Sequence, residues 1–256
     1  MEVPEIFYKY RSSDGESAKY LQKQIAHDEL YFAEPYTFND PFDCNPYFSL
    51  SGNEKSILKY YSQALKKNVP SMNRAARRME SKKTAKTIRS NSDEDGSKER
   101  TKNYYYNKIQ RGIGVYCLTT VPDNILMWSH YANNHKGVCL EYCGLNDFFA
   151  NAQKVAYADK RPIINAFSGE DNLLMADKAL LTKSSIWSYE EEWRMISYNL
   201  GPGIIVTPND LLKKVIIGAN ATNETIDLVL SSIEIRKHRP EVVYAKVDGR
   251  DYRIKI

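Results

Sequence analysis

The chain is poor in residues that cross-link proteins or bind metals. Its 256 residues include only 4 cysteines and 4 histidines. Cys44, Cys117, Cys139 and Cys143 form no C-x-x-C pair, and no histidine stands at zinc-finger spacing from them. The sequence therefore predicts neither a structural zinc site nor a disulfide framework. Reduced thiols of this kind are typical of a cytoplasmic protein.

Long apolar segments are also missing. The sequence contains no run of about 18 apolar residues, the minimum for a membrane-spanning helix. Glu2 and Glu5 stand where a secretion signal would carry positive charge. We therefore expect a cytoplasmic protein without a membrane span. A hydrophobic share of 42% is enough for a core that needs no cross-links.

The net charge of +4 hides an uneven distribution. Residues 54–111 carry 16 Lys and Arg against 6 Asp and Glu, which leaves the rest of the chain acidic. Apolar spacing predicts helices over 54–67 and 71–88, so we expect a basic helical insertion in a single domain spanning 1–256. The basic residues of 74–89 either form a solvated helix face or contact RNA, DNA or an acidic protein. The polar stretch 90–102 is expected to be a mobile connector.

The remaining segments predict an α+β fold. Strand-like and helix-like stretches follow each other without a regular βαβ rhythm, and no internal repeat occurs. We therefore expect a central mixed or antiparallel sheet with helical insertions. Strands are expected at 6–11, 30–33, 113–118, 137–142, 154–157, 192–197, 242–247 and 252–256, and further helices at 18–26, 123–132, 171–181 and 223–233.

The densest functional signal lies between Lys183 and Arg194. If residues 189–194 are extended, Glu190, Glu192 and Arg194 point to one face of the strand. In one interpretation this face is solvated and Arg194 pairs with a carboxylate. In the other, the carboxylate pair stabilises a cationic transition state, orients a sugar hydroxyl or holds a metal.

Two other segments are candidate binding elements. Residues 124–137 contain Trp128, His130 and Tyr131, which suit either a stacking platform for a ring or an ordinary packed helix. The loop 37–43 contains Asn39 and Asp40, which either bond the backbone of a turn or contact a ligand.

These motifs together resemble a bacterial family, the domain-of-unknown-function 2971 family. The resemblance runs from about residue 7 to about residue 218 and rests on five segments: residues 8–11, 38–43, 115–119, 127–137 and 183–194. Asp43 stands where the family commonly has Glu, and Leu118-Thr119 where it usually has Phe-Ser. The family implies no activity.

A more distant similarity concerns the order of three short patterns. Arg11 on an early strand, Thr119 at a strand end and Glu190 with Glu192 resemble the Arg, Ser, Glu-x-Glu arrangement of NAD-using ADP-ribosyltransferases. This resemblance implies an ADP-ribosyltransferase-like fold with NAD as co-substrate. Glu192 would stabilise an oxocarbenium-like transition state, Glu190 would orient or activate the acceptor, and Arg11 would hold a phosphate.

The leading hypothesis is an NAD-consuming enzyme, either a transferase with a protein or nucleic-acid acceptor or a glycohydrolase, acting as a toxin or phage-defence effector. It predicts that one cleft holds Arg11, Trp128, His130, Glu190 and Glu192. His130 joins the two glutamates as a catalytic candidate, and the candidates for NAD binding are Arg11, Tyr10, Thr119, Trp128, Tyr131, Asn39, Asp40, Lys183 and Arg194.

Two alternatives belong to other functional classes. In the first, Asp40, Asp43, Glu190 and Glu192 hold Mg²⁺ in a nuclease or nucleic-acid effector whose basic insertion grips phosphates. That alternative requires carboxylate oxygens that are not paired with Arg194 or Lys183. In the second, the chain is a sensor that binds a nucleotide or a phage protein without turnover.

Overall fold

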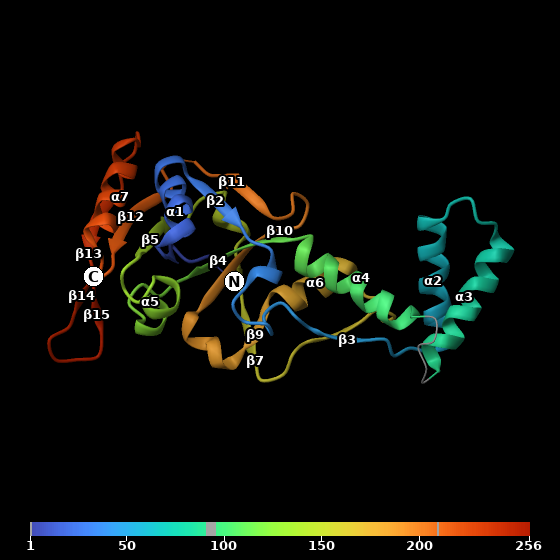
Figure 1. Ribbon diagram of the computed structural model, residues 1–256. Coiled ribbons are helices and arrows are strands. Elements are labelled where there is room, and N and C mark those ends of the chain that lie inside the picture. The colour runs from blue at the N-terminus through green and yellow to red at the C-terminus, as the bar shows by residue number, and fades with distance from the viewer. Residues whose placement is uncertain (1, 91–95, 209) are drawn as a thin grey trace.

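A seven-stranded sheet forms the centre of the molecule, with strand order β13-β12-β5-β1-β4-β10-β6 (Figure 1). The computed structural model describes residues 2–90, 96–208 and 210–256. Adjacent strands of the sheet are antiparallel except β12 and β13, which are parallel. The predicted α+β class with a central mixed sheet is confirmed. The strands are β1 (Ile6–Arg11), β4 (Gly114–Thr119), β5 (Val138–Cys143), β6 (Gln153–Lys154), β10 (Glu192–Ser197), β12 (Leu212–Ile217) and β13 (Glu241–Tyr244).

One face of the sheet is covered by α1 (Gly15–His27) and α7 (Asn223–Glu234), which contact each other (Figure 1). Alternation along the strands directs Phe7, Tyr116 and Trp193 toward this face, where they join the largest apolar cluster. The rings of Phe7 and Trp193 lie 5.8 Å apart in an edge-to-face arrangement. Burial of these large rings fixes which strand residues point to the opposite face.

The opposite face is divided into two apolar clusters. At one end, Tyr10 packs against Trp128 of α5 (Ile125–Tyr131). At the other end, Val115 and Ile196 pack beneath α4 (Ser97–Arg111) and α6 (Asn172–Leu180). Thr119, Cys117, Glu192 and Arg194 lie on the strands between these clusters, and they share this face with Val115 and Ile196 because they follow them at every second residue. A polar site is therefore placed in the middle of an otherwise apolar face.

The first part of the predicted basic insertion 54–111 forms a helical hairpin at one end of the molecule, away from the sheet (Figure 1). The hairpin consists of α2 (Glu54–Asn68) and α3 (Arg74–Arg89), whereas α4 belongs to the body. Asn53 and Asn73 cap the two helices by accepting hydrogen bonds from the backbone amides of Ser56 and Ala76.

The predicted mobile connector at 90–102 is wrong for its last residues. Residues 97–102 form the first turns of α4. This helix is held in place by Tyr105 and Ile109, which pack in the apolar cluster that contains Val115, called the second apolar cluster below. Their tertiary packing overrides the polar local sequence. Residues 91–95 lie outside the described ranges.

The remaining strands form four two-stranded sheets. The pairs are β2 (Glu29–Phe32) with β11 (Gly203–Val206), β3 (Tyr47–Ser49) with β8 (Ile163–Asn165), β7 (Ala156–Ala158) with β9 (Thr182–Ser184), and β14 (Lys246–Val247) with β15 (Ile254–Lys255). The described residues also form three 3₁₀ turns: η1 (Pro35–Thr37), η2 (Phe149–Asn151) and η3 (Ser185–Glu190). Among the described residues, no helix combines the length and the apolar character needed to cross a membrane.

The predicted strand 192–197 is confirmed, but the further condition that residues 189–194 are extended is not met at their start. Glu190 is the last residue of η3, Glu191 has a left-handed backbone with φ 44°, and β10 begins only at Glu192. Glu192 and Arg194 share a strand face as expected. Glu190 reaches the same site from a turn.

Close backbone packing at Gly137 gives a stability prediction. A Cβ at this position would lie 2.1 Å from the carbonyl oxygen of Arg11, so Gly137→Ala requires the β1 or β5 backbone to move. We expect the free energy of unfolding to fall by about 1–3 kcal/mol in urea denaturation. Gly249→Ala is the matched control, because no atom lies within 4 Å of its added Cβ. Equal stability of the two variants would contradict this packing.

Candidate functional site

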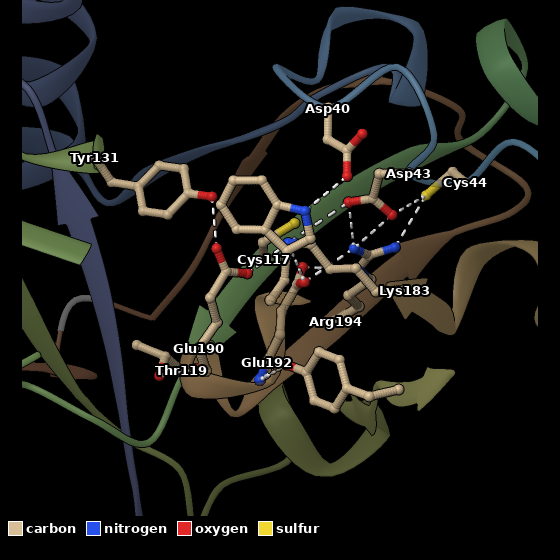
Figure 2. A network of polar contacts seen from close by, with 12 residues as sticks. Asp40, Asp43, Cys44, Cys117, Thr119, Tyr131, Lys183, Glu190, Glu192 and Arg194 are labelled. Carbon is tan, nitrogen blue, oxygen red and sulfur yellow. Dashed lines mark hydrogen bonds and ion pairs between the residues drawn. The ribbon is translucent and has the colours of Figure 1, made fainter. Parts of the chain in front are cut away.

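Three carboxylates converge on one buried ammonium group (Figure 2). Lys183 Nζ lies 2.5 Å from Glu190 Oε2, 3.0 Å from Glu192 Oε2 and 3.7 Å from Asp43 Oδ2. All four side chains are buried. Lys183 comes from β9, Glu190 from η3, Glu192 from β10 and Asp43 from the loop after η1. The Lys183 side chain therefore links the loop at Asp43 to the consecutive elements β9, η3 and β10.

A second cation, the fully buried guanidinium of Arg194, completes the network (Figure 2). Its Nε donates to Glu192 Oε1 at 2.7 Å, and its Nη2 donates to Asp43 Oδ2 at 2.7 Å. Its Nη1 donates to the carbonyl oxygen of Leu180 at 2.6 Å and lies 2.9 Å from Cys44 Sγ. Because each nitrogen has a partner, the guanidinium is held in one orientation.

The two glutamates differ in electrostatic environment. Burial alone would raise the pKa of Glu192, but Arg194 and Lys183 hold that pKa well below its usual range. Burial raises the pKa of Glu190 above its ordinary value, and Lys183 opposes this shift. The other oxygen of Glu190 accepts a hydrogen bond from the Tyr131 hydroxyl at 2.6 Å. Glu190 is therefore the carboxylate closer to a proton-transfer role.

A small cavity of about 170 Å³ adjoins this network. Its walls are mostly aromatic or apolar, with Glu190, Glu192, Asp43, Lys183 and Lys9 as charged groups. The lining residues are Tyr8, Lys9, Tyr10, Phe38, Asn39, Asp43, Cys117, Leu118, Thr119, Met127, Tyr131, Lys183, Glu190 and Glu192.

The cavity lies beside a gap in the central sheet. Strand β1 pairs with β5 along its whole length, but within these described strands it pairs with β4 only at Tyr8 and Thr119. The ammonium of Lys9 donates a hydrogen bond to the carbonyl oxygen of Cys117 at 2.7 Å. It takes the place of a backbone partner on β1, because Cys117 lies outside the single paired position of β1 and β4. Burial and the nearby Arg11 lower the pKa of Lys9 to about 8.

Seven of the predicted site residues line this one cavity: Tyr10, Asn39, Thr119, Tyr131, Lys183, Glu190 and Glu192. Arg194 lies beneath it as the fully buried partner of Glu192. Asp40 lies at the edge of the network, where its Oδ2 accepts a hydrogen bond from Trp187 Nε1 at 2.8 Å (Figure 2). The hydroxyl of Thr119 donates to the carbonyl oxygen of Glu190 at 2.5 Å, so Thr119 supports the turn that presents Glu190.

The prediction that Arg11, Trp128 and His130 share the cleft with the glutamates is wrong. Arg11 donates a hydrogen bond to Gln24 at 2.8 Å on the α1 side of the sheet, and its guanidinium lies over the ring of Tyr116. Trp128 is completely buried, and its indole nitrogen donates to the carbonyl oxygen of Pro122, so it has no free face for a ligand. His130 is exposed and contacts the edge of the Trp187 ring.

The geometry disfavours the magnesium alternative. Each oxygen of Glu190 and Glu192 already accepts a hydrogen bond from Tyr131, Lys183 or Arg194. The point where the carboxylates converge is occupied by the Lys183 ammonium, which supplies the positive charge a divalent ion would supply. Across the described ranges, no group of three or more His, Cys, Asp or Glu has an arrangement suited to a metal.

Several residues of the site have no predicted role. Lys9 stood in the first motif, but nothing in its spacing showed that it would enter the cavity. Tyr157 accepts a hydrogen bond from the backbone amide of Glu192 at 2.8 Å and carried no sequence signal. Burial raises the pKa of Cys117 to about 12, so this thiol is not an activated nucleophile.

Removal of the central cation gives the second prediction. Lys183→Met leaves three buried carboxylates with only Arg194 to balance them, so we expect a loss of about 3–5 kcal/mol in unfolding free energy at pH 8. The deficit should shrink at pH 5.5, because Lys183 lowers the pKa values of Glu190 and Glu192, so without the cation these two carboxylates bind protons more readily. Denaturant unfolding at both pH values measures this. The control Lys178→Met removes an exposed pair with Glu170 and should cost less than about 1 kcal/mol; a similarly small loss in Lys183→Met would show that the network is not needed.

Comparison with known proteins supports the family resemblance over part of the chain. A family model described as "Protein of unknown function (DUF2971)" matches residues 127–195. This range begins in α5 and ends in β10, so it contains Tyr131, Lys183, Glu190, Glu192 and Arg194. No match was found among curated proteins or among solved structures. The matched segment is similar to this family of unknown function and supplies most of the charged network.

Proposed function

We propose that the protein is an enzyme that cleaves the glycosidic bond between nicotinamide and ribose in NAD, passing ADP-ribose to water or to a macromolecular acceptor. The observation that carries this proposal is the placement of Glu190. Its buried carboxylate lines an aromatic cavity, and its pKa is raised by burial. Such a group can stabilise positive charge that develops on a sugar and can then accept a proton.

The shape of the cavity suits the reacting end of NAD. Pockets that enclose a whole drug-sized ligand measure about 300–1,000 Å³, and this cavity of about 170 Å³ is smaller. It offers room for one heterocycle, while the rest of the dinucleotide would lie outside. The nicotinamide ring of NAD is a cation, and aromatic walls with a carboxylate favour a cationic ring. Tyr8, Tyr10 and Tyr131 supply these walls.

The two glutamates would have different tasks. Glu192 is neutralised by Arg194 and Lys183, so we assign it as a positioning residue that holds Lys183 in place. Glu190 shares the Lys183 ammonium with Glu192 and accepts a hydrogen bond from the neutral Tyr131 hydroxyl. Because its charge is less fully balanced than that of Glu192, Glu190 is the better group to face the sugar. This assignment reverses the roles that the distant resemblance implies.

The proposed reaction balances with these residues alone. When the bond from ribose C1′ to the ring nitrogen breaks, its electron pair goes to the nitrogen and gives neutral nicotinamide. The positive charge passes to the ribose, where Glu190 stabilises it. Water or an acceptor hydroxyl then forms a bond to C1′ and transfers its proton to Glu190. Roles as a toxin or a phage-defence effector belong to the same proposal, since loss of NAD would stop cell growth.

Glu190→Gln tests the catalytic assignment. The amide keeps the size of the side chain but lacks the charge, so we expect nicotinamide release from NAD, measured by chromatography, to fall about 10²–10³-fold. Glu191→Gln is the control, because Glu191 is the exposed neighbour whose carboxylate accepts from Thr120. It should change the rate less than about threefold. Binding of NAD by the wild type without nicotinamide release or transfer of ADP-ribose would favour the sensor alternative and contradict the proposal.

The titration of Lys9 gives a pH prediction. Its pKa of about 8 means that the ammonium loses its proton as the pH rises from 7 to 9, and the cavity loses a positive charge. We expect the KM for NAD to fall by up to about tenfold over this range, following the neutral fraction of Lys9. Lys9→Met should show the low KM already at pH 7, with no change up to pH 9. A KM that rises with pH in the wild type would contradict a cationic ring in this cavity.

A further inference from the structure

The exposed face of α3 carries positive charge almost without interruption. Its exposed residues are Arg74, Ala75, Arg78, Met79, Lys82, Lys83, Lys86 and Arg89. Arg74, Arg78, Lys82 and Lys86 repeat every four residues, so they form one row along the helix. None of these four forms an ion pair with a described residue, and the nearby Arg89 pairs with Glu54 at 3.1 Å.

This arrangement is unfavourable for a helix that only faces water. Like charges four residues apart repel one another, and the first turn of α3 has no acidic residue to balance Arg74 near the positive end of the helix. Ordinary solvated helices alternate the sign of their charges. Here residues 54–90 contain 11 Lys and Arg against 2 Glu. The repulsion would be relieved by an anionic partner.

We propose that the exposed face of α3 binds the phosphodiester backbone of nucleic acid. The row from Arg74 to Lys86 extends about 18 Å, with cations about 6 Å apart. One strand of a duplex carries a phosphate every 3.4 Å of its axis, so several phosphates lie within reach of the row. An open hollow of about 720 Å³ runs beside the first turns, lined by Arg74, Ala75, Arg78, Met79 and Lys82.

Other anionic partners fit this face less well. An amphipathic helix that binds a lipid surface buries an apolar face, but the apolar side of α3 is already packed, with Ala85 and Ile88 in the second apolar cluster. An acidic protein would need an apolar contact region at its centre. The exposed face of α3 offers only Ala75 and Met79 for that purpose. A polyanion with regularly spaced charges requires no apolar centre.

The binding is expected to depend on charge and not on base sequence. The exposed face of α3 has no Asn or Gln to read base edges, and its row of cations suits contacts to phosphates. Affinity should therefore be similar for different sequences and should fall steeply with salt. The hairpin lies at the end of the molecule away from the sheet (Figure 1), so this proposal does not depend on the reaction proposed for the cavity.

The experiment measures fluorescence anisotropy of a labelled 20-base-pair DNA duplex, an RNA duplex and a single strand, at several salt concentrations. We expect micromolar binding at 50 mM salt. The triple variant Arg78→Glu, Lys82→Glu, Lys86→Glu should bind at least tenfold more weakly and lower the salt slope for duplex DNA by about 2.7, which corresponds to three lost phosphate contacts. Circular dichroism establishes that the variant is folded.

The matched control places the same charge change on the body. Lys19→Glu, Lys213→Glu and Lys246→Glu alter three exposed lysines, none of which forms an ion pair with a described residue. This control should bind within twofold of the wild type. Equal losses in the two variants would overturn the proposal, because binding would then follow net charge alone. Tighter binding of polyglutamate than of any nucleic acid, or no nucleic-acid binding by the wild type at 50 mM salt, would also overturn it.

Discussion

The buried ion network around Lys183 and Arg194 is the constraint on which the rest of the site depends. Buried charges are costly unless each one is paired and hydrogen-bonded. Here the two cations and three carboxylates meet this condition only if the loop at Asp43 and the consecutive elements β9, η3 and β10 stand in one arrangement. The network therefore fixes the loop at Asp43 and the turn at Glu190 relative to strand β10. A cavity next to such a network is preorganised before any ligand enters.

The same network divides the roles of the two glutamates. Glu192 is bound by both cations, so its charge is already balanced. Glu190 shares one cation and is presented by a turn whose last peptide is held by Thr119. The left-handed backbone of Glu191 separates the two, which lets them reach one ammonium from different directions. A regular strand would place both carboxylates side by side without this difference.

Much of the fold followed from the sequence, because alternation and helical spacing report directly on burial. Strand β1, helix α2 and strand β10 lie where these patterns predict. The charged segment 183–194, which the sequence singles out, supplies Lys183, Glu190 and Glu192 to the lining of the cavity. Helix α4 was missed, since it depends on tertiary contacts of Tyr105 and Ile109 and has a polar local sequence. A local sequence pattern therefore predicts an element when the apolar residues of that element repeat with its own period.

The errors at the site have a different origin. The ring of Trp128 and the guanidinium of Arg11 suit ligand binding. The type of a side chain does not reveal, however, which side of a sheet or helix it occupies. Trp128 faces Tyr10 in the core, and Arg11 faces Gln24. Lys9 enters the cavity because β1 and β4 pair at a single point, a feature of register that no local pattern encodes. Helices α2 and α3, in contrast, lie close to the ranges 54–67 and 71–88 that apolar spacing predicts.

The most direct measurement is a crystal structure of Glu190→Gln bound to NAD. We expect the nicotinamide ring in the cavity between Tyr8, Tyr10 and Tyr131, with ribose C1′ next to the side chain of residue 190 and the diphosphate outside. NAD bound elsewhere on the protein, or a cavity that stays closed to the ring at saturating NAD, would contradict it.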